Sequence, residues 1–268
     1  MNLLVFSGLF FPILLFGLSV YLFRICNKNL KLLVAFSGAF LLSLTFNELI
    51  PHIFGGISAE GHSHGHIHEH ESHLYFNINM MGLFVLAGFF IQLLLDYLTK
   101  GVEHGHLHSK CPAHESHLQG EPKYGISYIP VIIGLCLHSF LEAMPLAEGF
   151  SNDQIQKQLL LGIVIHNIPL SVVLMSLFIQ NGLSRRKSVI LLLIFALAGP
   201  AGVVSADFAG SYILQDMETF FKISMSLVVG IFLHISTTIL FESDEDHRFN
   251  YKKLAVIVLG ALIALIHF

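Results

Sequence analysis

Charged residues are scarce in this sequence: Asp, Glu, Lys and Arg together make up 12% of its 268 residues. That share is roughly half of the usual one for a soluble globular domain. Hydrophobic residues make up 54% of the chain, and phenylalanine alone occurs 24 times. The composition excludes an ordinary soluble protein. It predicts an all-α, polytopic chain, because helices satisfy their own backbone hydrogen bonds inside a lipid bilayer.

Several motifs are also absent. The three cysteines form no CxxC pair, so the sequence predicts no disulfide framework. No HExxH motif occurs, which excludes a zincin-type protease site. The first apolar segment lacks a basic n-region and a small-residue cleavage site, so we expect a retained span rather than a signal peptide. We expect no prosthetic group and no nucleic-acid partner.

Eight apolar segments are long enough to cross a bilayer, which takes about 20 mostly apolar residues. We therefore expect a single transmembrane domain over residues 1–268, built as a bundle of eight helices. The segments are 3–23, 30–53, 75–98, 125–149, 155–180, 186–209, 216–241 and 251–267.

The basic residues are distributed unevenly between the loops. If the segments alternate across the membrane with the N-terminus outside, the inner loops hold twelve of the fourteen basic residues. Only Lys157 and Lys222 then lie outside. The positive-inside rule places both termini on the outer face. We expect the plasma membrane or an inner cell membrane, and an organelle membrane would give the same charge pattern. The twelve residues are Arg24, Lys28, Lys31, Lys100, Lys110, Lys123, Arg185, Arg186, Lys187, Arg248, Lys252 and Lys253.

Two loops are rich in histidine. One spans residues 61–73 and is expected outside, and the other spans 103–117 and is expected inside. Such tracts have too little apolar content to fold, and their imidazoles bind metal. They either capture metal weakly or serve as plain polar linkers. Their histidines are His62, His64, His66, His68, His70 and His73 in the first loop, and His104, His106, His108, His114 and His117 in the second.

Three ionisable residues lie deep inside apolar segments. His138 and Glu142 are four residues apart and so share one helix face. His138 and His166 each lie about eleven residues from the outer end of their segment, or about 16 Å deep at 1.5 Å per residue. Antiparallel neighbours would bring the two histidines to one level, with Glu142 a turn away. Intramembrane ionisable residues are candidate functional sites, and two imidazoles with a carboxylate suit a divalent transition metal. The alternative is hydrogen bonding between buried helices.

Two prolines loosen the backbone beside these residues. Pro145 and Pro169 cannot donate to the carbonyls of Leu141 and Ile165. In lipid, those carbonyls need another partner, which the bundle interior or a bound cation can supply.

Other polar residues lie nearer the ends of their segments. Glu48 and His52 lie toward the outer end of the second segment, where they either form a vestibule or reach the interface. His234 lies toward the inner end of the seventh segment, where it either forms a release site or packs between helices. They are weaker candidates for binding metal on its way in or out.

These motifs together resemble the ZIP family of zinc and iron transporters. The most specific are HSFLEA (138–143) and HNIP (166–169), and ELIPH (48–52) is weaker. The resemblance implies a homodimer that takes up Zn²⁺ or a similar ion into the cytoplasm. It also implies that spans 1, 4, 5 and 6 move as a unit against spans 2, 3, 7 and 8.

The resemblance places His138, Glu142 and His166 on the main metal site of the family. Ser139 and Asn167 fall on second-site positions, where they offer only neutral oxygens. Family members with two metals often carry carboxylates where this chain has Leu170 and Gly199. We therefore expect one metal in the centre.

Zn²⁺ is the expected ion, while Fe²⁺, Mn²⁺, Co²⁺ and Cd²⁺ stay open because selectivity depends on geometry and availability. Three other functions compete with metal uptake. An efflux protein fits poorly, because aspartate–histidine pairs are missing. A multi-span membrane zinc hydrolase needs an HxxxH pair on a late helix, but Thr238 follows His234 at that spacing. A metal sensor is compatible with the sequence, although histidine loops on both faces favour transport. We expect no enzymatic activity.

Overall fold

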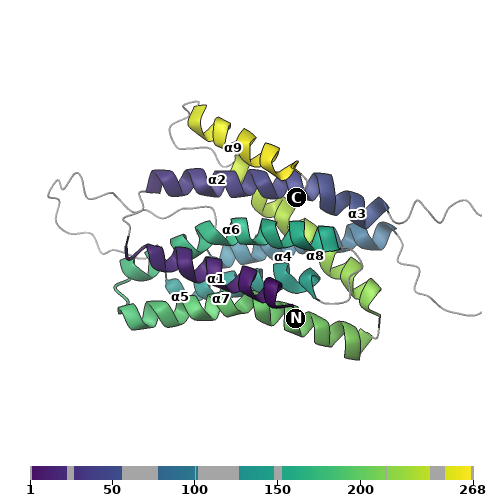
Figure 1. Ribbon diagram of the computed structural model, residues 1–268, viewed down its shortest axis with the longest axis horizontal. Helices are drawn as coiled ribbons and strands as arrows, with labels where there is room; N and C mark the ends of the chain where they lie inside the picture. Colours follow the sequence, from purple (N-terminus) through teal and green to yellow (C-terminus); the bar gives the residue numbers. More distant parts are fainter. Residues whose placement is uncertain are drawn as a thin grey trace, which may run out of the picture.

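The chain forms helices and connecting turns throughout the part that the structure, a computed structural model, describes. That part comprises residues 2–22, 27–55, 78–99, 101, 127–147, 153–214, 216–241 and 251–266. The helices are α1 (Leu3–Ser19), α2 (Asn27–Leu44), α3 (Ile50–Gly55), α4 (Ile78–Thr99), α5 (Tyr128–Ala143), α6 (Asp153–Gln180), α7 (Arg185–Phe208), α8 (Met217–Phe241) and α9 (Tyr251–Ala264). Figure 1 shows them side by side in one bundle.

Within the described ranges, six helical stretches are long and apolar enough to cross a membrane: Asn29–Phe54, Asn79–Thr99, Tyr128–Leu146, Gln154–Gln180, Arg185–Tyr212 and Met217–Phe241. Helices α1 and α9 are shorter, with 17 and 14 residues. Six of the eight expected spans therefore reach the required length, and an eight-span count is not established by length alone. Large apolar side chains remain exposed along α4, as expected for a surface in contact with lipid; examples are Leu86 at 51% and Leu94 at 59%.

Proline interrupts the regular α-helix at two places near the polar residues. Pro51 has no N–H to donate, and just before it the chain forms a π-helix over Thr45–Leu49, in which the Ile50 N–H donates to the Thr45 carbonyl. The second interruption is at Pro145, where α5 passes into a 3₁₀ turn over Met144–Leu146.

That 3₁₀ turn corrects two expectations from the sequence. The regular part of the fourth segment ends at Ala143 rather than near 149. The Leu141 carbonyl, which Pro145 cannot serve, accepts a hydrogen bond from the Met144 N–H. The freed carbonyl therefore finds a local partner and needs no cation.

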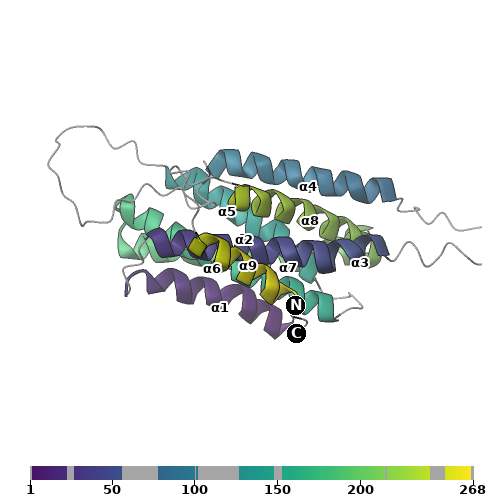
Figure 2. The same cartoon turned by 90° about the horizontal axis from the view of Figure 1, so that it is seen from above.

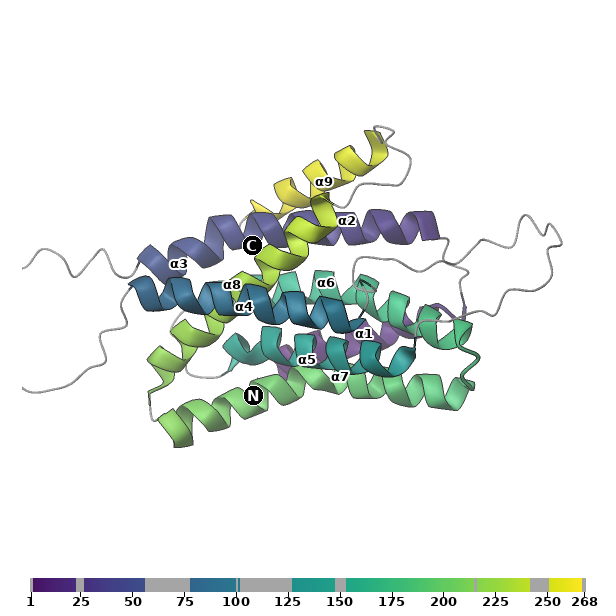
Figure 3. The same cartoon turned by 180° about the vertical axis from the view of Figure 1, so that it is seen from behind.

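The helices pack in two groups. In one group, α6 and α7 both pack on α1, and α5 packs on α7; in the other, α4 packs on α8 and α2 packs on α8 and α9. Figure 2 shows α4 and α1 at opposite edges of the bundle. The groups meet where α2 contacts α6 and where α4 contacts α5, and Figure 3 shows α4 on one face of the bundle against α8 and α5. The resemblance divides the spans in the same way, and the movement of one set against the other stays a prediction.

Glycines bring helices of one group into backbone contact. A Cβ atom added at Gly88 of α4 would overlap the Leu227 carbonyl of α8, and one added at Gly230 of α8 would overlap the Val85 carbonyl of α4. In the other group, a Cβ at Gly202 of α7 would overlap the Phe140 carbonyl of α5. Other glycines face side chains, both within the groups, as at Gly17 of α1 against Leu192 of α7, and between them. A Cβ at Gly162 of α6 would lie 2.6 Å from Leu44 Cδ2 of α2.

Candidate functional site

A cluster of polar side chains lies buried between α5 and α6. His138 and Glu142 of α5 are both 0% exposed, while His166 and Asn167 of α6 are 1% exposed. Their positions follow from helix geometry: residues 138 and 142 are one turn apart on α5, and residues 166 and 167 are consecutive on α6. The structure thus brings together the four residues that the two sequence motifs contribute.

Glu142 is the centre of the cluster. Its Oε2 lies 3.2 Å from His138 Nε2, and its Oε1 accepts a hydrogen bond from Asn167 Nδ2. The ring of His166 stands edge-on to the ring of His138, with 5.6 Å between the centroids and 83° between the planes. A carboxylate, two imidazoles and an amide therefore converge from two adjacent helices, in a region from which water is excluded.

A fifth polar residue comes from α4, and the sequence interpretation missed it. Gln92 is 0% exposed, and its Oε1 lies 3.1 Å from His138 Nδ1. The available signal was a single amide within the apolar run LFVLAGFFIQLLL of the third segment. Its partner could not be found from the sequence, because 46 residues separate it from His138.

Ser139 and Gly199 lie next to each other. Ser139 is 1% exposed, and a Cβ at Gly199 would lie 3.4 Å from its hydroxyl oxygen. The Ser139 hydroxyl has no hydrogen-bond partner among the described residues. Leu170 is also 1% exposed and packs in an apolar cluster with Leu135 and Phe195. The neighbourhood of the cluster therefore adds a neutral oxygen but no carboxylate from residues 170 or 199.

The distance between His138 Nε2 and Glu142 Oε2 can be compared with the spacing of two ligands on one Zn²⁺ ion. Zn²⁺ binds imidazole nitrogen and carboxylate oxygen at about 2.0–2.2 Å, usually with tetrahedral angles, so two such donors stand roughly 3.3–3.6 Å apart. The observed 3.2 Å lies just below that range, so a small separation of the two atoms would admit the ion. Among the described residues, no group of three His, Cys, Asp or Glu side chains is already arranged to hold a metal ion. The arrangement thus presents a pair of donors, with His166 beside it.

Glu48, His52 and His234 lie at other places in the bundle. Glu48 is partly buried in the π-helix, and the half-buried ring of His52 stands 5.8 Å from the ring of Phe221 in α8. His234 of α8 is 4% exposed, and its ring lies 4.9 Å from that of Phe89 in α4. Their roles in metal access and release stay predictions, and the histidine-rich tracts 61–73 and 103–117 lie outside the described residues.

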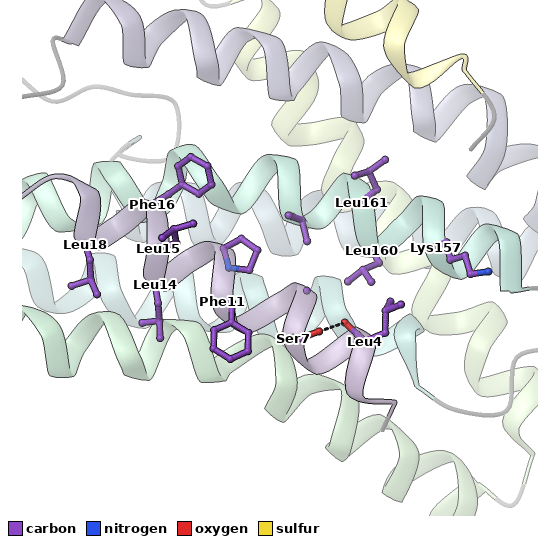
Figure 4. A pocket seen from close by; sticks show the side chains of 13 residues that line it. Leu4, Ser7, Phe11, Leu14, Leu15, Phe16, Leu18, Lys157, Leu160 and Leu161 are labelled. Carbon is purple, nitrogen blue, oxygen red and sulfur yellow. Dashed lines mark hydrogen bonds between the residues drawn. The ribbon is translucent and has the colours of Figure 1, made fainter. Parts of the chain in front are cut away.

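An apolar groove of about 840 Å³ runs between α1 and α6 (Figure 4). Leucine and phenylalanine side chains line most of it, and Lys157 is the one charged residue in its lining. None of the polar residues of the buried cluster lines it. Apart from Ser7 and Lys157 its lining side chains are apolar, so the groove is poorly suited to bind a cation.

One comparison with known proteins bears on the whole chain. A family model described as ZIP Zinc transporter matches residues 1–267.

Proposed function

Because the chain belongs to the ZIP zinc transporter family, whose members are membrane transporters of divalent metals rather than enzymes, we propose that it carries Zn²⁺ into the cytoplasm. The proposed route passes through the buried polar cluster, with His138, Glu142 and His166 as the ligands that bind the ion in transit. Ser139 and Asn167 supply neutral oxygens beside it.

The observation that carries this proposal is the His138–Glu142 pair. Ionisable groups inside a bilayer are costly, and they persist where they serve a pathway for ions. Both side chains are fully buried, and their facing donor atoms stand 3.2 Å apart. When His138 Nε2 carries no proton, the imidazole and the carboxylate both present lone pairs in this gap, so a cation between them turns a repulsive contact into an attractive one.

The donor types support Zn²⁺ as the transported ion. Imidazole nitrogen and carboxylate oxygen are common zinc ligands, whereas thiolates, which would favour Cu(I), do not occur in the cluster. Fe²⁺, Mn²⁺, Co²⁺ and Cd²⁺ accept the same donors and are the competitors to test. The ion is cargo, so its site must release it as well as bind it.

The proposed orientation places both termini outside, with α1 and α9 completing eight spans in a single domain over residues 1–268. The start of α1 and the end of α9 lie at the same level along the bundle, which supports termini on one side (Figure 1). Cysteines placed at Ser58 and Ser151 should react with an impermeant reagent added outside, whereas one placed at Ser184 should not. The opposite pattern would contradict the orientation. The homodimer implied by the resemblance is part of the same proposal.

Metal uptake into proteoliposomes tests the assignment. His138→Ala and His166→Ala should each nearly abolish Zn²⁺ uptake while leaving folded protein in the bilayer, because each removes a ligand. Deleting residues 61–73 should weaken uptake only at low Zn²⁺, because that loop at most raises the local concentration. If the deletion abolishes uptake and His166→Ala does not change it, the assignment is wrong.

A further inference from the structure

Gln92 is a buried amide on a helix that otherwise shows much of its surface to lipid. Its neighbours Ile91 and Leu93 are 36% and 45% exposed, whereas Gln92 is 0% exposed. Burying an amide is unfavourable unless its polar atoms find hydrogen-bond partners. The contact between Gln92 Oε1 and His138 Nδ1, at 3.1 Å, meets that need for the amide oxygen.

This contact selects one form of the His138 ring. An amide oxygen can only accept a hydrogen bond, so the contact with Gln92 Oε1 favours the form of the ring that carries its proton on Nδ1. In a neutral imidazole, the other nitrogen, Nε2, then has the free lone pair. Nε2 is the atom that lies 3.2 Å from Glu142 Oε2. Gln92 therefore biases His138 toward the tautomer whose lone pair points toward Glu142.

The close packing of α4 against α5 allows the Gln92 side chain to reach His138. Gly134 lies one turn before His138 on α5, and a Cβ there would come 2.5 Å from Thr99 Cγ2 on α4. The absence of that Cβ allows α4 and α5 to approach closely. Gln92 and Thr99 are seven residues apart and so lie on the same face of α4. The close approach at Gly134 thus brings the Gln92 side chain within hydrogen-bonding distance of the next turn of α5.

We propose that Gln92 is a positioning residue for zinc transport, acting through His138 rather than by touching the ion. This inference rests on the proposed function. Groups that orient a ligating histidine typically change metal affinity or activity by about 10- to 100-fold when removed. Without Gln92, His138 divides its population between two tautomers and several ring orientations, and only a fraction is competent to bind. The expected loss is therefore in the apparent affinity for Zn²⁺ rather than in the maximal rate.

The test measures initial Zn²⁺ uptake against Zn²⁺ concentration in proteoliposomes that contain the full chain. Gln92→Met keeps the side-chain length but removes the acceptor, and KM should rise about tenfold or more while the maximal rate changes less than about twofold. Gln92→Glu keeps an acceptor at the same reach, so its KM should stay near or below that of the wild type. Gln158→Met is the matched control, because Gln158 is a buried glutamine of α6 and is 8% exposed. Its KM should not change.

Each outcome decides a different point. If Gln92→Met and Gln92→Glu both keep the wild-type KM, the inference is wrong. If both lower the maximal rate equally and leave KM unchanged, Gln92 serves packing and the inference is also wrong. If Gln92→Met does not fold, Gln92→Asn withdraws the acceptor by one methylene, and its KM should rise relative to that of Gln92→Glu. Unimpaired uptake by His138→Ala would instead refute the proposed function itself.

Discussion

Replacing Glu142 by glutamine separates a role in transport from a role in folding. Glutamine has the same shape as glutamate and can still accept the hydrogen bond from Asn167 that Glu142 Oε1 accepts in the structure. It can also donate to His138 Nε2, which lies 3.2 Å from Oε2. The change removes the negative charge and leaves the packing of the fully buried side chain in place.

Glu142→Gln should have a large effect on Zn²⁺ affinity and a small effect on the stability of the metal-free protein. Removing one member of a fully buried charge pair costs about 3–5 kcal/mol, which corresponds to roughly 100- to 4,000-fold in affinity when the other member is the bound Zn²⁺. In the metal-free protein, losing a charge-assisted hydrogen bond costs about 1 kcal/mol, and relief from burying a carboxylate offsets that cost. The metal-free protein should therefore be as stable as the wild type or more stable.

Two measurements on the same preparation test this expectation: the concentration dependence of Zn²⁺ uptake in proteoliposomes, and thermal unfolding in the presence of a chelator. Glu218→Gln is the control carboxylate. Glu218 is 78% exposed and pairs with Lys222 at 2.6 Å, so its replacement should change stability by less than about 1 kcal/mol and leave uptake unchanged. Wild-type uptake by Glu142→Gln would refute the charge argument. A large loss of stability without metal would show that the carboxylate is structural.

Three further outcomes are expected. Gly88→Ala should destabilise the protein by about 1–3 kcal/mol, because the new methyl group meets the Leu227 carbonyl. Gly82→Ala on the same helix has open space and should be neutral or stabilising. Equal melting temperatures of the two variants would contradict this prediction. A variant without residues 61–73 and 103–117 should bind about one Zn²⁺ tightly per chain by calorimetry. Two ions about 3.5–4 Å apart need bridging carboxylates, and residues 170 and 199 do not supply them. Tight binding of two Zn²⁺ per chain would contradict this prediction. Hydrogen bonds from the Thr219 side chain and N–H lower the pKa of Asp216 below its ordinary 3.8. The carboxylate therefore contributes its full stabilisation of the fold above pH 3.8, and this stabilisation is lost as the pH falls through the folded-state pKa. Asp216→Ala should thus cost about 0.5 kcal/mol at neutral pH, and the difference from wild type in thermal unfolding should disappear in acid.

The apolar segments could be predicted from the sequence because each is defined locally, by a run of hydrophobic residues. The meeting of residues 138, 142 and 166 was also within reach, because their spacing and depth follow from helix geometry. The contact of Gln92 with His138 could not be predicted, because it depends on which helix packs beside α4. A run of hydrophobic residues does not specify which helix its own helix packs against. The π-helix before Pro51 and the early end of α5 were missed for another reason: a proline shows where an α-helix is disturbed but not which hydrogen bonds replace the lost one.

The glycine contacts give the bundle an uneven stiffness. Where a glycine meets a backbone carbonyl, as at Gly88 and Gly230, neither helix can slide without a steric clash. We therefore expect α4 and α8 to move together as a rigid unit. Between α2 and α6, the contact at Gly162 is with the methyl groups of Leu44 and Leu41, whose side chains can change rotamer as they pass.

At the seam between the two helix groups, where α2 meets α6 and α4 meets α5, Gly162 and Gly134 meet side chains more closely than backbone. A displacement along this seam would carry His138, Glu142 and His166 together, because α5 and α6 belong to one group. It would leave Gln92 behind on α4 and break its hydrogen bond to His138. The proposed ligands thus lie on one helix group, and Gln92, the residue proposed to orient His138, lies on the other.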